Sequence, residues 1–162
     1  MNLEDYILNS DEESHKHRLY GKLMDMLDLP MLQTISREQA SEQIERLCFQ
    51  IMQDSPTPLS VDSRHKIVRQ LLDEILGHGP LEPLLADPGI ADIMVNGAKN
   101  IYVERRGRIE RVPLTFNDDA HLMGVIERIV SSVGRRIDEL SPMVDARLKD
   151  APGSTPLFRR WR

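Results

Sequence analysis

The feature that most constrains this fold is a change in hydrophobic period near residue 80. Before it, apolar residues recur every three to four positions, which predicts amphipathic helices. After it, IADIMVN, NIYVERR and RIERVPL have strand character and are joined by only a few residues. Such short connections exclude βαβ crossovers, so the strands should pair antiparallel. The sequence therefore predicts an α+β fold, with helices first and a small sheet after them.

Three helices are expected in the first half, and together they predict a three-helix bundle. The first covers 13–27 and stops at Asp28-Leu29-Pro30, while a capping box of Ser36 and Gln39 starts the second. The third begins near Ser60 or Asp62 and ends at Gly77. The residues expected to face inward are Leu19, Leu23, Met26, Leu27, Ala40, Ile44, Leu47, Cys48, Ile51, Met52, Val68, Leu71, Leu72, Ile75 and Leu76.

The second half predicts a sheet with one packed helix. The pair Asn96-Gly97 indicates a hairpin between the first two strands, and GPLEPLLADPG before them fits a short helix or turn. A fourth helix should start at Asn117 or Asp118 and pack on one face of the sheet, with RRIDELSPMVDARL extended after it. Its expected inner face is Leu122, Ile126, Ile129, Val130 and Val133.

Composition narrows the possible functions. The single cysteine, Cys48, excludes an internal disulfide and lies on a helical apolar stripe, so it should be a small core residue in a reducing, cytoplasmic setting. No apolar run is long enough to span a membrane. Residues 1–60 hold 5 Lys/Arg against 11 Asp/Glu, and residues 61–162 hold 16 against 15, so neither part resembles a nucleic-acid-binding domain.

Motifs for catalysis are lacking, and we predict no catalytic or metal-binding residue. The sequence contains no phosphate-binding P-loop, no His-Glu-x-x-His zinc motif and no Gly-x-Ser-x-Gly elbow. The arginines remain: Arg105, Arg106, Arg108 and Arg111 surround one hairpin, and Arg135, Arg136 and Arg147 surround the last folded segment. Guanidinium groups suit phosphate binding, but from spacing alone a solvated, salt-bridged surface is the favoured explanation.

A series of motifs in the second half of the chain is typical of one protein family. The segments GPLEPLL, DIMVNG, IYVERRG, GRRIDE and SPMVDARL follow one another between residues 79 and 148. This run resembles the amino-terminal domain of the type II/type IV secretion ATPases, and most closely the CpaF-type ATPases of tight-adherence (Flp) pilus assembly. The resemblance covers about residues 60–148, and residues 13–60 resemble the helical region that precedes it in that subfamily.

The resemblance implies a function in an assembly. Family members are hexameric motors driven by ATP and Mg²⁺, attached to the inner face of the membrane through platform proteins of the pilus or secretion system. Their Walker motifs lie in a second, RecA-like domain, which is absent from these 162 residues. Arg135, Arg136 and Arg147 lie on matching motifs and are the implied contacts to nucleotide phosphates in an intact assembly. Without the second domain, this chain should not hydrolyse ATP.

The last residues depart from the family pattern. After SPMVDARL, family members continue PDGSRVNAIIPPLAL, whereas this chain reads KDAPGSTPLFRRWR. A coding sequence can be written for DGSRVNAIIPPLA that, after loss of a single G, encodes DAPGSTPLFRRWR, which is residues 150–162. We therefore expect a truncated protein with a non-native, frameshifted tail at 149–162. Loss of the strand SRVNAI should leave one sheet edge unpaired.

The expected organisation is thus a disordered acidic leader at 1–12, a helical region at 13–59, the α+β domain at 60–148 and the tail at 149–162. A second function stays open. A free-standing adaptor domain could use the basic RRWR end to bind an acidic partner, a nucleic acid or an anionic membrane, although so few charges would bind weakly. Deletion of 149–162 discriminates, because only an adaptor would lose its partner.

Overall fold

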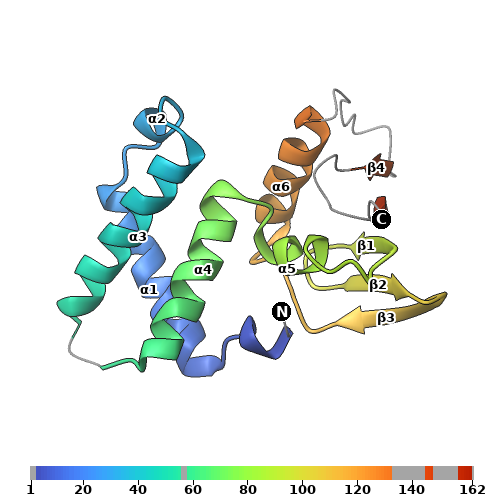
Figure 1. Cartoon of the computed structure of the whole chain (residues 1–162), viewed down its shortest axis with the longest axis horizontal. Helices are drawn as coiled ribbons and strands as arrows, with labels where there is room; N and C mark the ends of the chain where they lie inside the picture. The colour runs from blue at the N-terminus through green and yellow to red at the C-terminus, as the bar shows by residue number, and fades with distance from the viewer. Residues whose placement is uncertain (1–2, 56–57, 133–144, 148–156, 162) are drawn as a thin grey trace. The chain divides into compact units, whose positions relative to one another are not determined.

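The computed structural model describes residues 3–55, 58–132, 145–147 and 157–161, with side chains described only as far as Ile129. The chain forms two compact units, Asn2–Gly77 and His78–Arg162, each with its own elements (Figure 1). The boundary at Gly77 lies later than the expected position near residue 60, because the helix that ends at Leu76 packs with the preceding helices. The mixed α+β fold class is confirmed.

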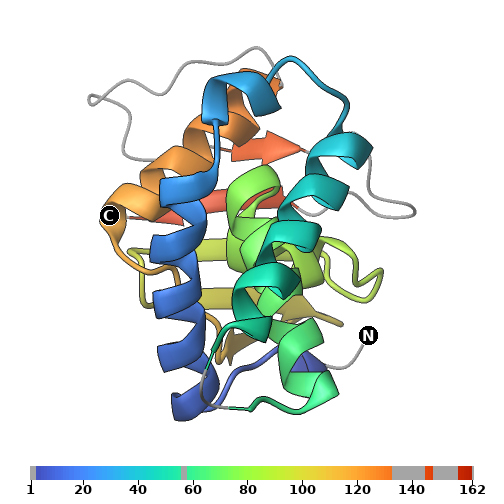
Figure 2. The same cartoon turned by 90° about the vertical axis from the view of Figure 1, so that its left-hand side faces the viewer.

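The helical unit consists of η1 (Leu3–Asp5), α1 (Ser10–Met26), α2 (Leu29–Leu32), α3 (Arg37–Gln53) and α4 (Val61–Leu76). Helices α1, α3 and α4 pack pairwise around one core, as the views in Figures 1 and 2 show. The predicted bundle is therefore confirmed. Its buried residues are Leu8, Leu19, Leu23, Leu32, Ala40, Ile44, Cys48, Ile67, Val68 and Leu71.

Local caps explain where the helices begin. Ser36 and Gln39 form the predicted capping box of α3, and Ser60 caps α4. Helix α1 starts three residues earlier than expected, because Asn9 and Glu12 form a second capping box: Asn9 Oδ1 accepts from the Glu12 amide at 2.9 Å. The caps thus account for the boundaries that the hydrophobic pattern alone leaves uncertain.

A second, short helix follows α1 directly. Asp28 caps the short helix α2, with Met31 N donating to Asp28 Oδ1 at 3.1 Å, and Pro30 occupies an early position where no amide hydrogen is needed. Met26, expected to face inward, lies at the last residue of α1 and is 50% exposed. The inward face of α1 therefore ends with buried Leu23 and partly buried Leu27.

The leader was expected to be disordered, and the structure contradicts this. Tyr6 is only 2% exposed, and its hydroxyl donates to Asp73 Oδ2 at 2.9 Å. The Gln70 amide donates to the Tyr6 carbonyl at 2.6 Å, and the Arg69 guanidinium lies 5.9 Å from the Tyr6 ring centroid. One aromatic residue with several partners on α4 thus orders a segment whose acidic composition suggested disorder.

A buried ion pair joins α1 to α4. Lys16 is 7% exposed, and its Nζ donates to Glu74 Oε1 at 2.9 Å and to Gln70 Oε1 at 3.0 Å. Nearby Glu12 is also buried and accepts from the Ser63 hydroxyl at 2.6 Å. Burial alone raises the pKa of Glu12, but the hydrogen bonds from Ser63 and Asn9, together with the charge of Lys66, outweigh burial, so this pKa lies below its usual value.

Cys48 is a core residue, as predicted. Its side chain is fully buried, and burial, with a smaller effect of Glu45, raises the pKa of the thiol to about 12. The neutral thiol is therefore the form present at physiological pH. This environment suits a small apolar residue and not a nucleophile.

The second unit contains η2 (Gly79–Leu81), α5 (Glu82–Leu85), β1 (Asp92–Asn96), β2 (Ile101–Arg105), β3 (Arg108–Val112), α6 (Asp119–Ser132), β4 (Asp145–Arg147) and β5 (Leu157–Trp161). Strands β1, β2 and β3 form the predicted antiparallel meander. Side chains alternate as expected in β2, where Ile101 and Val103 are buried. The order across the sheet is β3-β2-β1-β5-β4.

The sheet also contains a parallel pair that was not predicted. Strand β5 lies parallel to β1, with Asp92 opposite Leu157, and β4 pairs antiparallel with β5. One edge of the sheet was expected to lack a partner, whereas the structure pairs β1 with residues of the divergent tail. An exposed strand edge offers unpaired amides and carbonyls to any extended segment, which is the physical reason for such pairing.

Helix α6 follows its prediction closely. Asp118 is the cap, since its Oδ1 accepts from His121 N at 2.7 Å, and Leu122, Ile126 and Ile129 are buried together with Val125. The side chain of Val130 and all of Val133 lie outside the described residues, as does most of RRIDELSPMVDARL. The described part of α6 supplies core residues of this unit.

The buried pair yields a stability prediction. Lys16→Ala should lower the free energy of unfolding of the helical unit by about 3 kcal/mol, because it leaves Glu74 and Gln70 without their buried donor. Urea unfolding followed by circular dichroism measures the change. The matched double variant Lys16→Met/Glu74→Leu should recover part of the loss, since it removes the buried carboxylate together with the cation, while Gln70 Oε1 still lacks its donor. A single variant as stable as the parent chain would contradict a structural role for this pair.

Candidate functional site

The three arginines that the sequence singled out cannot be grouped into a site from this structure. Arg135 and Arg136 lie outside the described residues. Arg147 is the last residue of β4, where its backbone pairs with Leu157 of β5. Their contact with nucleotide phosphates therefore stays a prediction.

The described candidate is the arginine-rich hairpin of β2 and β3. The two strands are joined by Arg106 and Gly107, both in the left-handed region with φ of 49° and 75°. This matches a two-residue type I′ turn, whose backbone twist suits a hairpin. Arg105 and Arg108 face one another in the register across this turn. The geometry places four arginines within one short hairpin: Arg105, Arg106, Arg108 and Arg111.

Two of these arginines have structural contacts. An NH2 group of Arg105 lies 2.8 Å from Asp87 Oδ2, and Asp87 Oδ1 accepts from the Gly89 amide at 2.8 Å. Arg111 donates to the Lys99 carbonyl at 3.1 Å. The ion pair neutralises Arg105 opposite Arg108, which lowers the repulsion between like charges in a cross-strand pair. Asp87 and Arg105 are distant in sequence, so no local signal could have revealed their pairing.

The other two arginines are the ones that could bind a partner. Arg106 and Arg108 are exposed, and the part of the chain that the structure describes offers neither of them an ion-pair partner. Strand β3 is an edge strand, and its Ile109 is 64% exposed. An edge that combines cations with an apolar side chain can contact an anionic group or pair with another protein. It contains no group for acid–base or nucleophilic catalysis.

The hairpin is joined to the rest of its unit through the pairing of β2 with β1 and through contacts of the turn between these two strands. Phe116 N donates to the Ala98 carbonyl at 2.8 Å, and Lys99 Nζ donates to the carbonyls of Phe116 and Asn117 at 3.0 and 3.1 Å. These bonds connect the β1–β2 turn to the segment that leads into α6. The hairpin is therefore a supported element and not a free loop.

Neither a metal site nor a membrane span is found within the described ranges. No group of three or more His, Cys, Asp or Glu side chains there could hold a metal ion. None of the helices in those ranges combines the length and the apolar character needed to cross a bilayer. The five histidines of the chain belong to no such group among these residues.

Comparisons with known proteins bear on the second unit. Residues 74–152 match the family described as type II/IV secretion system protein. Two proteins named conjugal transfer protein, from Mycobacterium tuberculosis strains CDC 1551 and H37Rv, are each 32% identical over 81 residues, which is 50% of this chain and 23% of theirs. An uncharacterized protein of Methanocaldococcus jannaschii is 25% identical over 146 residues, covering 89% of this chain and 58% of that protein.

These matches differ in what they cover. The chain spans less than a quarter of the length of the mycobacterial proteins, whereas the archaeal alignment is too long to fit within either unit alone. The archaeal alignment therefore includes residues of both units. Residues 74–152 are therefore similar to the family described as type II/IV secretion system protein, and the mycobacterial matches extend the similarity to proteins named for conjugal transfer.

Proposed function

We propose that this chain is the amino-terminal, non-catalytic part of a CpaF-type ATPase of tight-adherence (Flp) pilus assembly. The observation that carries the proposal is the agreement between the family match at 74–152 and a compact unit that begins at His78. Three of the motifs coincide with described elements: GPLEPLL forms η2 and α5, DIMVNG forms β1 and its turn, and IYVERRG forms β2 and its turn.

The proposed role is assembly and regulation. Full-length members of the proposed subfamily couple ATP hydrolysis, with Mg²⁺, to pilus assembly or secretion. In this proposal the unit joins a hexamer on the cytoplasmic side, peripheral to the inner membrane, and contacts platform proteins there. The edge strand β3 with exposed Arg108 and Ile109, together with Arg106 in the turn before it, supports such a role, since it offers both backbone and side-chain groups to a partner.

We further propose that Arg135, Arg136 and Arg147 approach the nucleotide phosphates of the assembled enzyme. A guanidinium delivered to a phosphoryl group stabilises the charge of the transition state and can act from a neighbouring domain or subunit. This chain contains no P-loop sequence, so the phosphates and Mg²⁺ would be held by a catalytic domain.

The proposal predicts that the chain alone does not hydrolyse ATP. The purified 162-residue chain should release no phosphate from Mg-ATP above a buffer blank, because it contains no sequence able to cradle the β- and γ-phosphates. A coupled phosphate-release assay with and without EDTA measures this. Chelator-sensitive hydrolysis that follows the chain through two chromatographic steps would contradict the proposal.

A second prediction tests the arginines. When residues 1–147 precede the catalytic domain of a related secretion ATPase, Arg135→Ala, Arg136→Ala or Arg147→Ala should lower kcat by about a hundredfold or more for each residue that reaches the phosphates. Arg46→Ala, which removes an exposed arginine from α3, is the matched control and should leave kcat unchanged. Unaltered kcat in all three variants would exclude the proposed role.

A third prediction addresses the subfamily. Affinity capture of the tagged chain from its own cells should recover inner-membrane platform proteins of a tight-adherence pilus. The double variant Arg106→Ala/Arg108→Ala should recover less of them, because it removes the two hairpin cations that have no ion pair among the described residues, while Arg46→Ala should not. Recovery of the platform of a conjugation or type II secretion system instead would place the chain in another branch of the family.

A further inference from the structure

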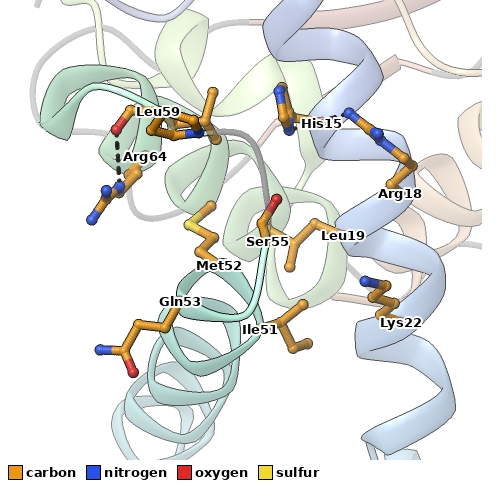
Figure 3. Close-up of a pocket in the computed structure, with 11 residues that line it drawn as sticks. His15, Arg18, Leu19, Lys22, Ile51, Met52, Gln53, Ser55, Leu59 and Arg64 are labelled. Carbon is orange, nitrogen blue, oxygen red and sulfur yellow. Dashed lines mark hydrogen bonds between the residues drawn. The ribbon is translucent and has the colours of Figure 1, made fainter.

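The helical unit contains a pocket of about 590 Å³ that neither the family match nor the proposed function explains. It lies between the face of α1 that carries His15, Arg18 and Lys22 and the carboxyl end of α3, as Figure 3 shows. The spacing of these three residues, three and then four positions, places them on one side of the helix. The first turn of α4 contributes Arg64.

The charge of the pocket is opposite to that of the unit around it. Between Asn2 and Gly77 the sequence holds 14 Asp/Glu and 8 Lys/Arg, so the unit is acidic overall. Three of those eight cations, Arg18, Lys22 and Arg64, line the pocket, whereas no Asp or Glu is found among its lining residues within the described chain. A concave site with cations and no carboxylate concentrates positive potential, which attracts an anion.

The cations are also available for a ligand. Lys22 has no ion pair among the residues that the structure describes. An NH2 group of Arg18 lies 3.3 Å from His15 Nδ1. Arg64 is held by its Nε, which donates to the Leu59 carbonyl at 3.1 Å (Figure 3). This bond orients the guanidinium and leaves its two terminal nitrogens to donate elsewhere. A guanidinium fixed in this way loses less conformational freedom when it binds an oxyanion.

The remaining walls are apolar. Leu19 is buried, and Ile51, Met52 and Leu59 are partly buried at the pocket. Such walls can cover an apolar body while the cations bind a charged group, and the volume lies within the usual range of about 300 to 1,000 Å³ for small-molecule sites. A single carboxylate carries only one charge, whereas a phosphate monoester carries nearly two and has three acceptor oxygens.

We propose that this pocket binds a small organic phosphate, with the phosphate at Arg18 and Lys22 of α1, the apolar body against Leu19, Met52 and Leu59, and Arg64 adding positive potential from the opposite side. The ligand class follows from the number of cations and the apolar walls. The site lies in the helical unit and is independent of the nucleotide contacts proposed above, which involve arginines of the second unit.

The test uses the whole chain and three probes. The probes are 4-methylumbelliferyl phosphate, the phosphate-free 4-methylumbelliferone and inorganic phosphate, and binding is followed by equilibrium dialysis and by amide chemical shifts. We expect the first probe to bind most tightly, with shifts at residues 15–22 and 51–64. Arg18→Gln/Arg64→Gln should weaken its binding by about tenfold to a hundredfold, because a charged hydrogen-bond donor and the positive potential of Arg64 are lost.

Matched controls separate the pocket from general attraction. Arg46→Gln removes the same charge from an exposed position of α3 and should change the affinity less than about twofold. Thermal unfolding followed by circular dichroism checks that each variant folds like the parent. Equal binding of 4-methylumbelliferone, equal losses in Arg46→Gln and the double variant, or shifts confined to other residues would each overturn the proposal. Tighter binding of an acidic peptide, tested in the same dialysis, would overturn the ligand class.

Discussion

The amino-terminal half of this protein depends on an ammonium group that has been removed from water. Lys16 Nζ replaces part of its hydration with the oxygens of Gln70 and Glu74, so α1 is matched to α4 by a polar contact as well as by apolar packing. A slip of one helical turn, about 5.4 Å, would separate the charge from both acceptors on α4 and leave it only Glu13 of its own helix, whose Oε2 lies 3.5 Å away. The same Gln70 side chain then holds the leader through the Tyr6 carbonyl. One buried cation thus sets the register of several segments.

The remaining cations of the protein are used in different ways, and their surroundings distinguish them. Arg105 is neutralised by Asp87 and serves the hairpin, whereas Arg106 and Arg108 project from it without a described ion-pair partner. The pocket of the helical unit gathers Arg18 and Arg64 next to apolar side chains. An arginine count could not separate these groups. What separates them is whether a carboxylate lies within reach and whether the neighbouring surface is apolar.

Much of the fold was predictable because its signals are local. The capping boxes, the alternation of Ile101 and Val103, and the apolar face of α6 each depend on residues a few positions apart. The misses involve distant partners: Tyr6 is ordered by α4, and β5 pairs with β1 across more than sixty residues. The cationic face of α1 was visible as a spacing, but the arrival of Arg64 beside it depends on helix packing. The assignment of Arg135, Arg136 and Arg147 to nucleotide phosphates came from the resemblance alone and stays a prediction.

The contact between Tyr6 and Asp73 has a consequence for how such proteins are built. These residues lie near the two ends of the helical unit, and their hydrogen bond of 2.9 Å brings both ends to one place. A unit whose first and last segments are adjacent is closed by its own contacts, and adjacent ends are a common property of domains. It can also fold before the residues that follow it are synthesised, since its core is complete by Leu76. The closure of the leader onto α4 thus makes the helical unit a self-contained module.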